Sequence, residues 1–186
     1  MKFQCVDDVG HPADQVFHLI RDRQPELVPY LSDVESIEVL EREDLDDGQV
    51  RIVNMWRGSA RSAPAVVQKF LSPDLLSWKD HATWYPEGPP RAEWRLEPKI
   101  GSSLFECTGR TAIVAADEGC RIEISGDLSV YPEKVPGVPR LLAGRLRSKI
   151  EAFVVDMIVP NLQTMARGVQ NFLDDQSDAA SGSASE

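Results

Sequence analysis

Hydrophobic and polar residues alternate through residues 77–96, SWKDHATWYPEGPPRAEWRL. With the two-residue period of a β-strand, Trp78, Asp80 and Trp84 share one face, and Trp94 repeats the pattern after a turn rich in proline and glycine. The stretch predicts two antiparallel strands with large aromatic rings on one face. A carboxylate on that face is unusual, and it makes the face the first candidate for a functional site.

Similar patterns predict the elements on either side. Residues 2–9 (KFQCVDDV) alternate as a short strand, and residues 11–23 (HPADQVFHLIRDR) carry the apolar stripe of a helix, which Pro12 is suited to open. Residues 24–31 (QPELVPYL) predict a second, proline-broken helical turn. Two further hairpins are predicted around the turns at residues 46–48 and 117–119. Residues 62–72 predict a short helix or an irregular connection.

The last predicted element is a long helix from about Arg140 to Asp174. Its apolar stripe includes Leu142, Leu146, Ile150, Phe153, Met157, Met165, Val169 and Phe172. Pro160 lacks the N–H that the helix needs, so we expect a bend there. Residues 175–186 have little apolar content and predict a disordered tail after a single domain, residues 1–174.

Composition narrows the function classes. The chain has 186 residues and a formal net charge of −10, which argues against a nucleic-acid partner. It has no apolar run long enough to span a membrane and no signal-peptide pattern at its start, and its three cysteines show no metal-ligand spacing. We therefore expect a cytoplasmic protein with reduced cysteines, without a metal or other cofactor.

The order of elements resembles the helix-grip fold of the START/Bet v1-like (SRPBCC) superfamily, in particular a bacterial branch of it. The segments that carry this resemblance are KFQCVDDV, HPADQVFHLIRD and LLAGRLRSKIEAFVVDMIVPNLQTMARGVQNFL, and it extends over about residues 2–174. It implies an α+β fold, in which a curved antiparallel sheet wraps around the long C-terminal helix and two short helices follow the first strand. It also implies an apolar ligand held between sheet and helix.

Alternation along the strands then predicts which side chains line that cavity. The expected ligand-binding residues on the sheet are Asn54, Trp56, Trp78, Asp80, Trp84 and Trp94, and those on the helix are Phe153 and Met157. An alternative is that the tryptophans only fill the core and that Asp80 turns outward at a strand end or bulge. If Asp80 is buried, it needs a hydrogen-bond donor, a ligand, water or a proton.

A basic segment stands out in this acidic chain. Residues 134–149 contain no acidic residue and carry the cations Arg140, Arg145, Arg147 and Lys149 near the start of the long helix. These cations either pair with glutamates of the sheet or contact an anionic membrane or an acidic ligand.

Three functions remain open at this point. The first is the binding or transport of an apolar or amphipathic, lipid-like small molecule without covalent chemistry. The second is a cyclase or hydratase type of enzyme that uses Asp80 as general acid or base. The third is an interaction module whose core is filled by its own side chains.

Overall fold

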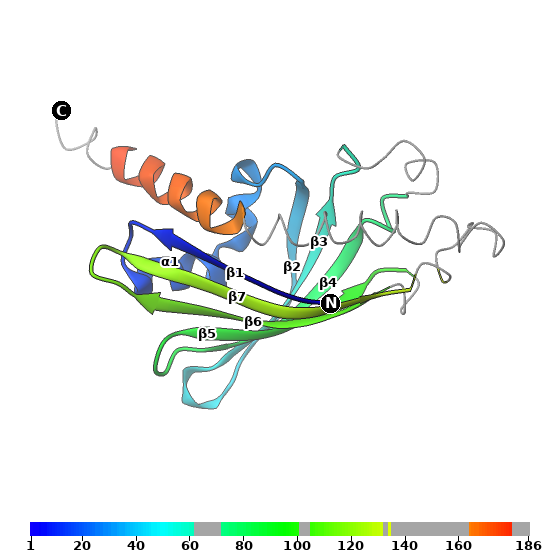
Figure 1. Ribbon diagram of the computed structural model, residues 1–186, viewed down its shortest axis with the longest axis horizontal. Helices are drawn as coiled ribbons and strands as arrows, with labels where there is room; N and C mark the ends of the chain where they lie inside the picture. The colour runs from blue at the N-terminus through cyan, green and yellow to red at the C-terminus, as the bar shows by residue number, and fades with distance from the viewer. Residues whose placement is uncertain (62–71, 101–104, 132–133, 135–163, 180–186) are drawn as a thin grey trace.

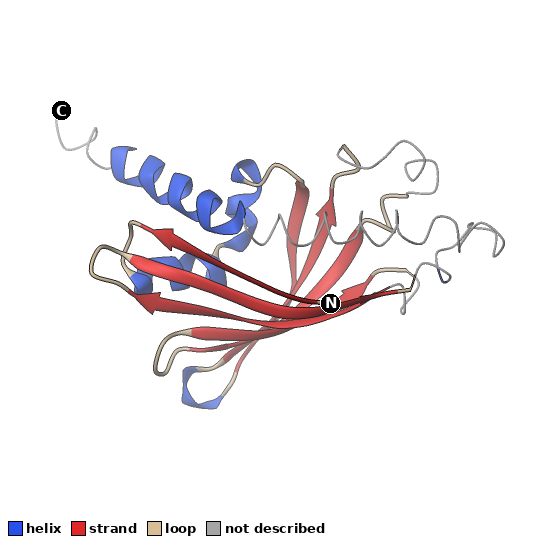
Figure 2. Ribbon diagram, viewed as in Figure 1, coloured by secondary structure: helices blue, strands red, loops and turns tan. Residues whose placement is uncertain are grey.

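The computed structural model describes residues 1–61, 72–100, 105–131, 134 and 164–179. One antiparallel sheet of seven strands, in the order β1-β7-β6-β5-β4-β3-β2, curves around helices on its inner side (Figures 1 and 2). Its strands are β1 (Lys2–Val9), β2 (Val34–Asp44), β3 (Val50–Gly58), β4 (Ser77–Tyr85), β5 (Arg91–Pro98), β6 (Phe105–Ala115) and β7 (Cys120–Val130). The short helices are α1 (Ala13–Asp22), η1 (Gln24–Tyr30) and η2 (Asp46–Gly48). The predicted α+β helix-grip fold is confirmed.

The register of the strands fixes which side chains share the inner face. Asn54 on β3 lies opposite Asp80 on β4, which in turn lies opposite Leu96 on β5. Leu96 faces Cys107 on β6, and Cys107 faces Leu128 on β7. Because a strand repeats every two residues, the tryptophans two or four positions from Asp80 point to the same side. The faces predicted from alternation are those that the structure shows.

Two glycines leave room for an aromatic pair on this face. A β-carbon at Gly109 would lie 2.4 Å from Cζ2 of Trp94, and one at Gly126 would lie 2.5 Å from Cζ of Phe3. Trp94 and Phe3 therefore lie flat over neighbouring strands and stack with their ring centroids 6.5 Å apart. This packing places the indole of Trp94 against the floor of the sheet.

The core lies between the inner face and the helices. Val16 in α1, Leu27 in η1 and Val169 in the C-terminal helix are fully buried, as are Ile113 and Ile122 on the sheet. The helical residues 164–179 lie on the inner side of the sheet (Figure 1), where Phe172 meets Tyr30 of η1 edge to face at 5.6 Å. Helices of two separate chain segments thus cover one end of the curved face.

Long-range hydrogen bonds hold this C-terminal helix in place. The Gly10 amide donates to Oε1 of Gln170 at 2.7 Å, and Nε2 of His11 lies 2.8 Å from Oδ1 of Asp174. The Tyr30 hydroxyl donates to Oδ2 of Asp175 at 2.7 Å. The helix continues to residue 179, so the tail boundary predicted after Asp174 is wrong for residues 175–179.

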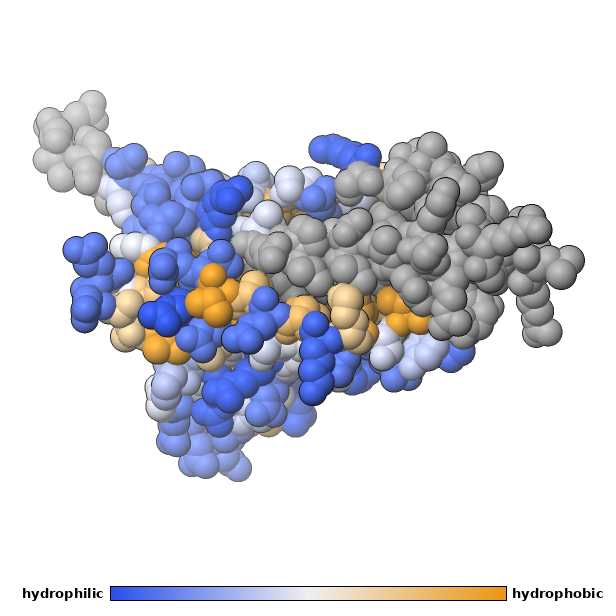
Figure 3. Space-filling view, in the orientation of Figure 1, coloured by the Kyte–Doolittle hydropathy of each residue, from blue (hydrophilic) through white to orange (hydrophobic). Residues whose placement is uncertain are grey.

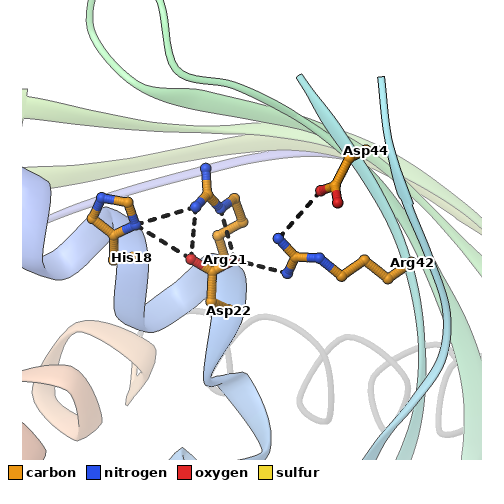
Figure 4. A network of polar contacts seen from close by, with 5 residues as sticks. All are labelled: His18, Arg21, Asp22, Arg42 and Asp44. Atoms are coloured by element: carbon orange, nitrogen blue, oxygen red, sulfur yellow. Dashed lines mark hydrogen bonds and ion pairs between the residues drawn. The ribbon is translucent and has the colours of Figure 1, made fainter. Parts of the chain in front are cut away.

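A polar network at the end of α1 joins the helix to the edge strand β2 (Figure 4). Arg21 donates to Asp22 from Nε at 2.8 Å and from Nη2 at 2.7 Å, and Arg42 of β2 donates to the same carboxylate at 2.8 Å. Partial burial opposes ionisation, but these hydrogen bonds outweigh it and hold the pKa of Asp22 well below its usual range. The network fixes the point where α1 passes into η1.

The described surface carries a few exposed hydrophobic side chains. Figure 3 shows hydrophobic side chains along the strip that β1 occupies in Figure 1, with hydrophilic ones between them. In the described part of the chain the exposed large hydrophobic residues are Met1, Val6, Val39 and Leu40. Within the same residues, no helix is long and apolar enough to cross a bilayer.

Several predicted features lie outside the described residues. They are Phe153, Met157, the bend at Pro160, the cations Arg140, Arg145, Arg147 and Lys149, and nearly all of the connection at residues 62–72. The membrane contact predicted from these cations therefore stays a prediction.

Candidate functional site

A cavity of about 70 Å³ lies between the inner face of the sheet and the helices. All four tryptophans of the chain line it, together with Asp80. Among the described residues, Ile20 of α1, Gln24 of η1 and Met165 of the C-terminal helix line the side opposite the sheet. The structure thus brings together five of the six sheet residues that alternation placed in the predicted cavity.

The tryptophans are well packed and also border the empty space. Trp56 and Trp78 stack at 6.0 Å with 15° between their planes, and Trp84 meets Phe17 of α1 edge to face at 5.7 Å. Nε1 of Trp94 donates to Oγ1 of Thr111 at 3.1 Å. Core packing and cavity lining are therefore combined in the same rings, although the sequence analysis set them as alternatives.

Asp80 lines the cavity and is half-buried. Oδ1 is enclosed and has no hydrogen-bond partner among the described residues, whereas Oδ2 is not enclosed. Burial without a partner raises the pKa of Asp80 to about 7. The carboxyl can therefore give or take a proton near neutral pH.

Asn54 lies behind the cavity wall and is buried. Its Nδ2 donates to Oε1 of Gln24 at 2.6 Å, which ties β3 to the first residue of η1. Cβ atoms opposite each other on antiparallel strands are about 4.5–5.5 Å apart, so Asn54 is also a close neighbour of Asp80. Gln24, Asn54 and Asp80 form one group at the polar end of the cavity.

Three enclosed atoms near this group lack hydrogen bonds within the described structure. They are Oδ1 of Asn54, Nε1 of Trp56 and Oδ1 of Asp80. An unsatisfied buried polar atom costs about 1–3 kcal/mol of stability. Natural cores avoid such atoms, so three of them on adjacent positions of two strands make this group the strongest candidate for a functional site among the described residues.

Other reactive side chains do not contribute to this site. Burial, reinforced by the charge of Asp80, raises the pKa of Cys107 to about 12, so its thiol is not a ready nucleophile. His11, His18 and His81 pair with Asp174, Asp22 and Glu97, respectively. None of the described histidine, cysteine and acidic side chains form a group of three that would hold a metal ion.

Two polar residues of the cavity were not predicted from the sequence. Thr111 lies on the inner face of β6, where the alternation of that strand was a usable signal. Gln24 follows the apolar stripe of α1 and looks like a polar helix end, because its burial depends on how η1 folds back onto β3.

Known structures share this architecture. The Zhui aromatase/cyclase of a Streptomyces species is 14% identical with a TM-score of 0.66, and 97% of each chain is covered. Norcoclaurine synthase of Thalictrum flavum is 14% identical with a TM-score of 0.55, covering 93% of this chain and 86% of its own. A START superfamily protein of Mycobacterium smegmatis is 14% identical with a TM-score of 0.50, covering 94% and 98%. The fold is START/Bet v1-like.

The particular family follows from the sequence. A family model described as "Protein of unknown function (DUF2505)" matches residues 6–173, and the chain belongs to that family. No curated protein is a significant sequence relative of this chain.

The raised pKa of Asp80 predicts an unusual dependence of stability on pH. The folded-state pKa of about 7 lies above the ordinary value of 3.8, so the folded protein binds more protons between these values. The contribution of Asp80 to the free energy of unfolding is therefore fully present at low pH and falls as the pH rises from about 4 to 7. Above pH 7 it no longer changes. We expect Asp80→Asn to be more stable than wild type by about 1–4 kcal/mol near pH 8.5, and by much less near pH 4.5.

Urea unfolding at both pH values measures this difference. The exposed Asp117, in the turn between β6 and β7, provides the matched control, because Asp117→Asn removes the same charge far from the cavity. An Asp80→Asn protein with no gain in stability near pH 8.5 would show that the folded protein already stabilises the carboxylate.

Proposed function

We propose that the protein binds a small, mainly apolar molecule in the cavity between the sheet and the C-terminal helix. The observation that carries this proposal is the unpaired carboxyl of Asp80 in a cavity walled by four tryptophans. Ligand sites are typically apolar hollows with a few placed polar groups, and this cavity has that composition. A ligand with a polar group would provide the partner that the described protein does not.

The volume of the cavity bears on the size of the ligand. Sites for drug-sized ligands enclose about 300–1,000 Å³, and an apolar cavity of about 150 Å³ takes up benzene. A cavity of about 70 Å³ favours a compact ligand over an extended acyl chain. Binding even one ring requires the walls to move apart, and Met165 is the lining side chain best suited to repack.

The similar structures support a ligand-holding role at the level of the fold. Two of them are named for enzymes, an aromatase/cyclase and a synthase, and a third for the START superfamily. Because their identities are near 14%, they support the proposal through shape alone, and the chemistry must come from the residues of this chain.

Titration with toluene, followed by NMR of the tryptophan indole N–H signals, tests the binding proposal. All four indoles border the cavity, so we expect shifts in these signals that saturate with toluene. Ala82→Leu should abolish the shifts, because Ala82 lines the cavity and a larger side chain fills it. Ala116→Leu is the matched control, since Ala116 is exposed.

Two results would contradict the proposal. One is the absence of any saturable shift in the wild type, which would favour the interaction module with a filled core. The other is an Ala82→Leu protein that binds toluene as well as the wild type does.

The pKa of Asp80 near 7 favours one second function, an enzyme that uses this carboxyl as general acid or base. A catalytic group is most effective when its pKa lies near the working pH. Cyclisation and dehydration of carbonyl compounds need proton transfer of this kind, in a water-poor cavity. Asp80 is the only titratable side chain among the described lining residues, so it would both remove and return the proton.

The base-catalysed ring opening of 5-nitrobenzisoxazole tests this second function. A carboxylate removes the ring C–H proton, the electrons of that bond form the nitrile, and the N–O bond breaks to give a coloured cyanophenolate. We expect a rate that rises with ionisation of Asp80, with a midpoint near pH 7, and that disappears in Asp80→Asn while toluene binding persists. A rate unchanged in Asp80→Asn would exclude Asp80 as the base and leave the binding proposal intact.

A further inference from the structure

The polar end of the cavity offers both a hydrogen-bond donor and an acceptor. Gln24 uses Oε1 to accept from Asn54, while its Nε2 makes no hydrogen bond within the described residues and is not enclosed. Oδ2 of Asp80 is likewise not enclosed and has no partner there. Both residues line the same cavity. A ligand in this cavity therefore has an amide N–H and a carboxyl oxygen among otherwise mainly apolar walls.

The hydrogen bond from Asn54 fixes the orientation of the Gln24 side-chain amide. Oε1 of Gln24 is held 2.6 Å from Nδ2 of Asn54, and Asn54 lies directly opposite Asp80 in the register of β3 and β4. The Gln24 amide is therefore fixed at one end, with its NH₂ group free to reach a ligand. The ion-pair network at Asp22 and Arg42 sits just before η1 and sets the position of its first residue. The donor and the acceptor thus belong to a built site.

Charge complementarity narrows the ligand class. The described lining contains no lysine, arginine or histidine, so these residues would offer an anionic group no cation and would place it against the carboxyl of Asp80. An ammonium group could pair with that carboxyl but offers no acceptor to Nε2 of Gln24. A hydroxyl group donates and accepts at one atom, and so complements the pair.

The walls of the cavity indicate which kind of ligand carries the hydroxyl group. The indoles of Trp56 and Trp78 lie nearly parallel, and Trp84 and Phe17 meet edge to face. Flat rings stack against such surfaces in offset or edge-to-face contacts, which contribute about 0.5–1.5 kcal/mol beyond area burial. The small volume also selects a compact ring over a flexible chain.

We infer that the cavity takes an uncharged aromatic ring bearing a hydroxyl group, whose oxygen accepts from Nε2 of Gln24 and donates to Asp80. Phenol is the smallest molecule of this class. This inference rests on the binding function proposed above and adds to it the ligand class and the specificity residue Gln24.

Phenol and toluene are a matched pair of probes, because they have nearly the same shape and differ in the hydroxyl. The measured quantity is the selectivity, the Kd of toluene divided by the Kd of phenol, obtained from the indole N–H signals. Removing one hydrogen bond to the ligand should lower the selectivity by about tenfold. We expect this loss in Gln24→Met and in Asp80→Leu, with toluene binding retained in both as proof that the cavity is formed.

Gln49→Met is the control for Gln24→Met, because Gln49 lies in the turn between β2 and β3 and does not line the cavity. Its selectivity should equal that of the wild type. If both rings bind but the selectivity is the same in the wild type, Gln24→Met and Asp80→Leu, the hydroxyl site is wrong and the binding function stands.

Two other outcomes would also overturn the inference. Benzylamine that binds the wild type more tightly than phenol, and loses this affinity in Asp80→Leu, would show that the cavity recognises a cation. Failure of both phenol and toluene to bind the wild type would remove the inference together with the binding function.

Discussion

The unpaired carboxyl of Asp80 is the constraint on which the account of this protein depends. A carboxylate enclosed by tryptophans is unfavourable in water-poor surroundings, and burial raises its pKa to about 7. A protein built only for stability would place an apolar side chain here, as such replacements are often stabilising. A carboxyl at this position therefore supports the proposal that the cavity binds a ligand.

The rest of the fold places this carboxyl and controls what can reach it. The register of β3, β4 and β5 sets Asp80 between Asn54 and Leu96 on the inner face. The helices close the cavity from the other side, and the hydrogen bond between Asn54 and Gln24 joins the two layers.

The inner face was predictable because it depends on a local period. The side chains of Trp56, Trp78, Asp80, Trp84 and Trp94 follow from alternation, which survives regardless of how the rest of the chain folds. Gln24 was missed because its burial comes from η1 docking on β3, a contact between distant parts of the chain. The helix end at residues 175–179 was misjudged for the same reason, since Tyr30 holds Asp175. The volume of the cavity depends on how all its walls pack and leaves no pattern in the sequence.

A carbon-13 NMR titration of the Asp80 side-chain carboxyl, assigned by comparison with Asp80→Asn, tests the central claim most directly. We expect an apparent pKa near 7 in the free protein, because the carboxyl is buried and has no hydrogen-bond partner among the described residues. An apparent pKa near the ordinary aspartate value of about 4 would contradict it. That result would mean that solvent or a protein donor already stabilises the charge. The carboxyl would then not require a ligand as its hydrogen-bond partner.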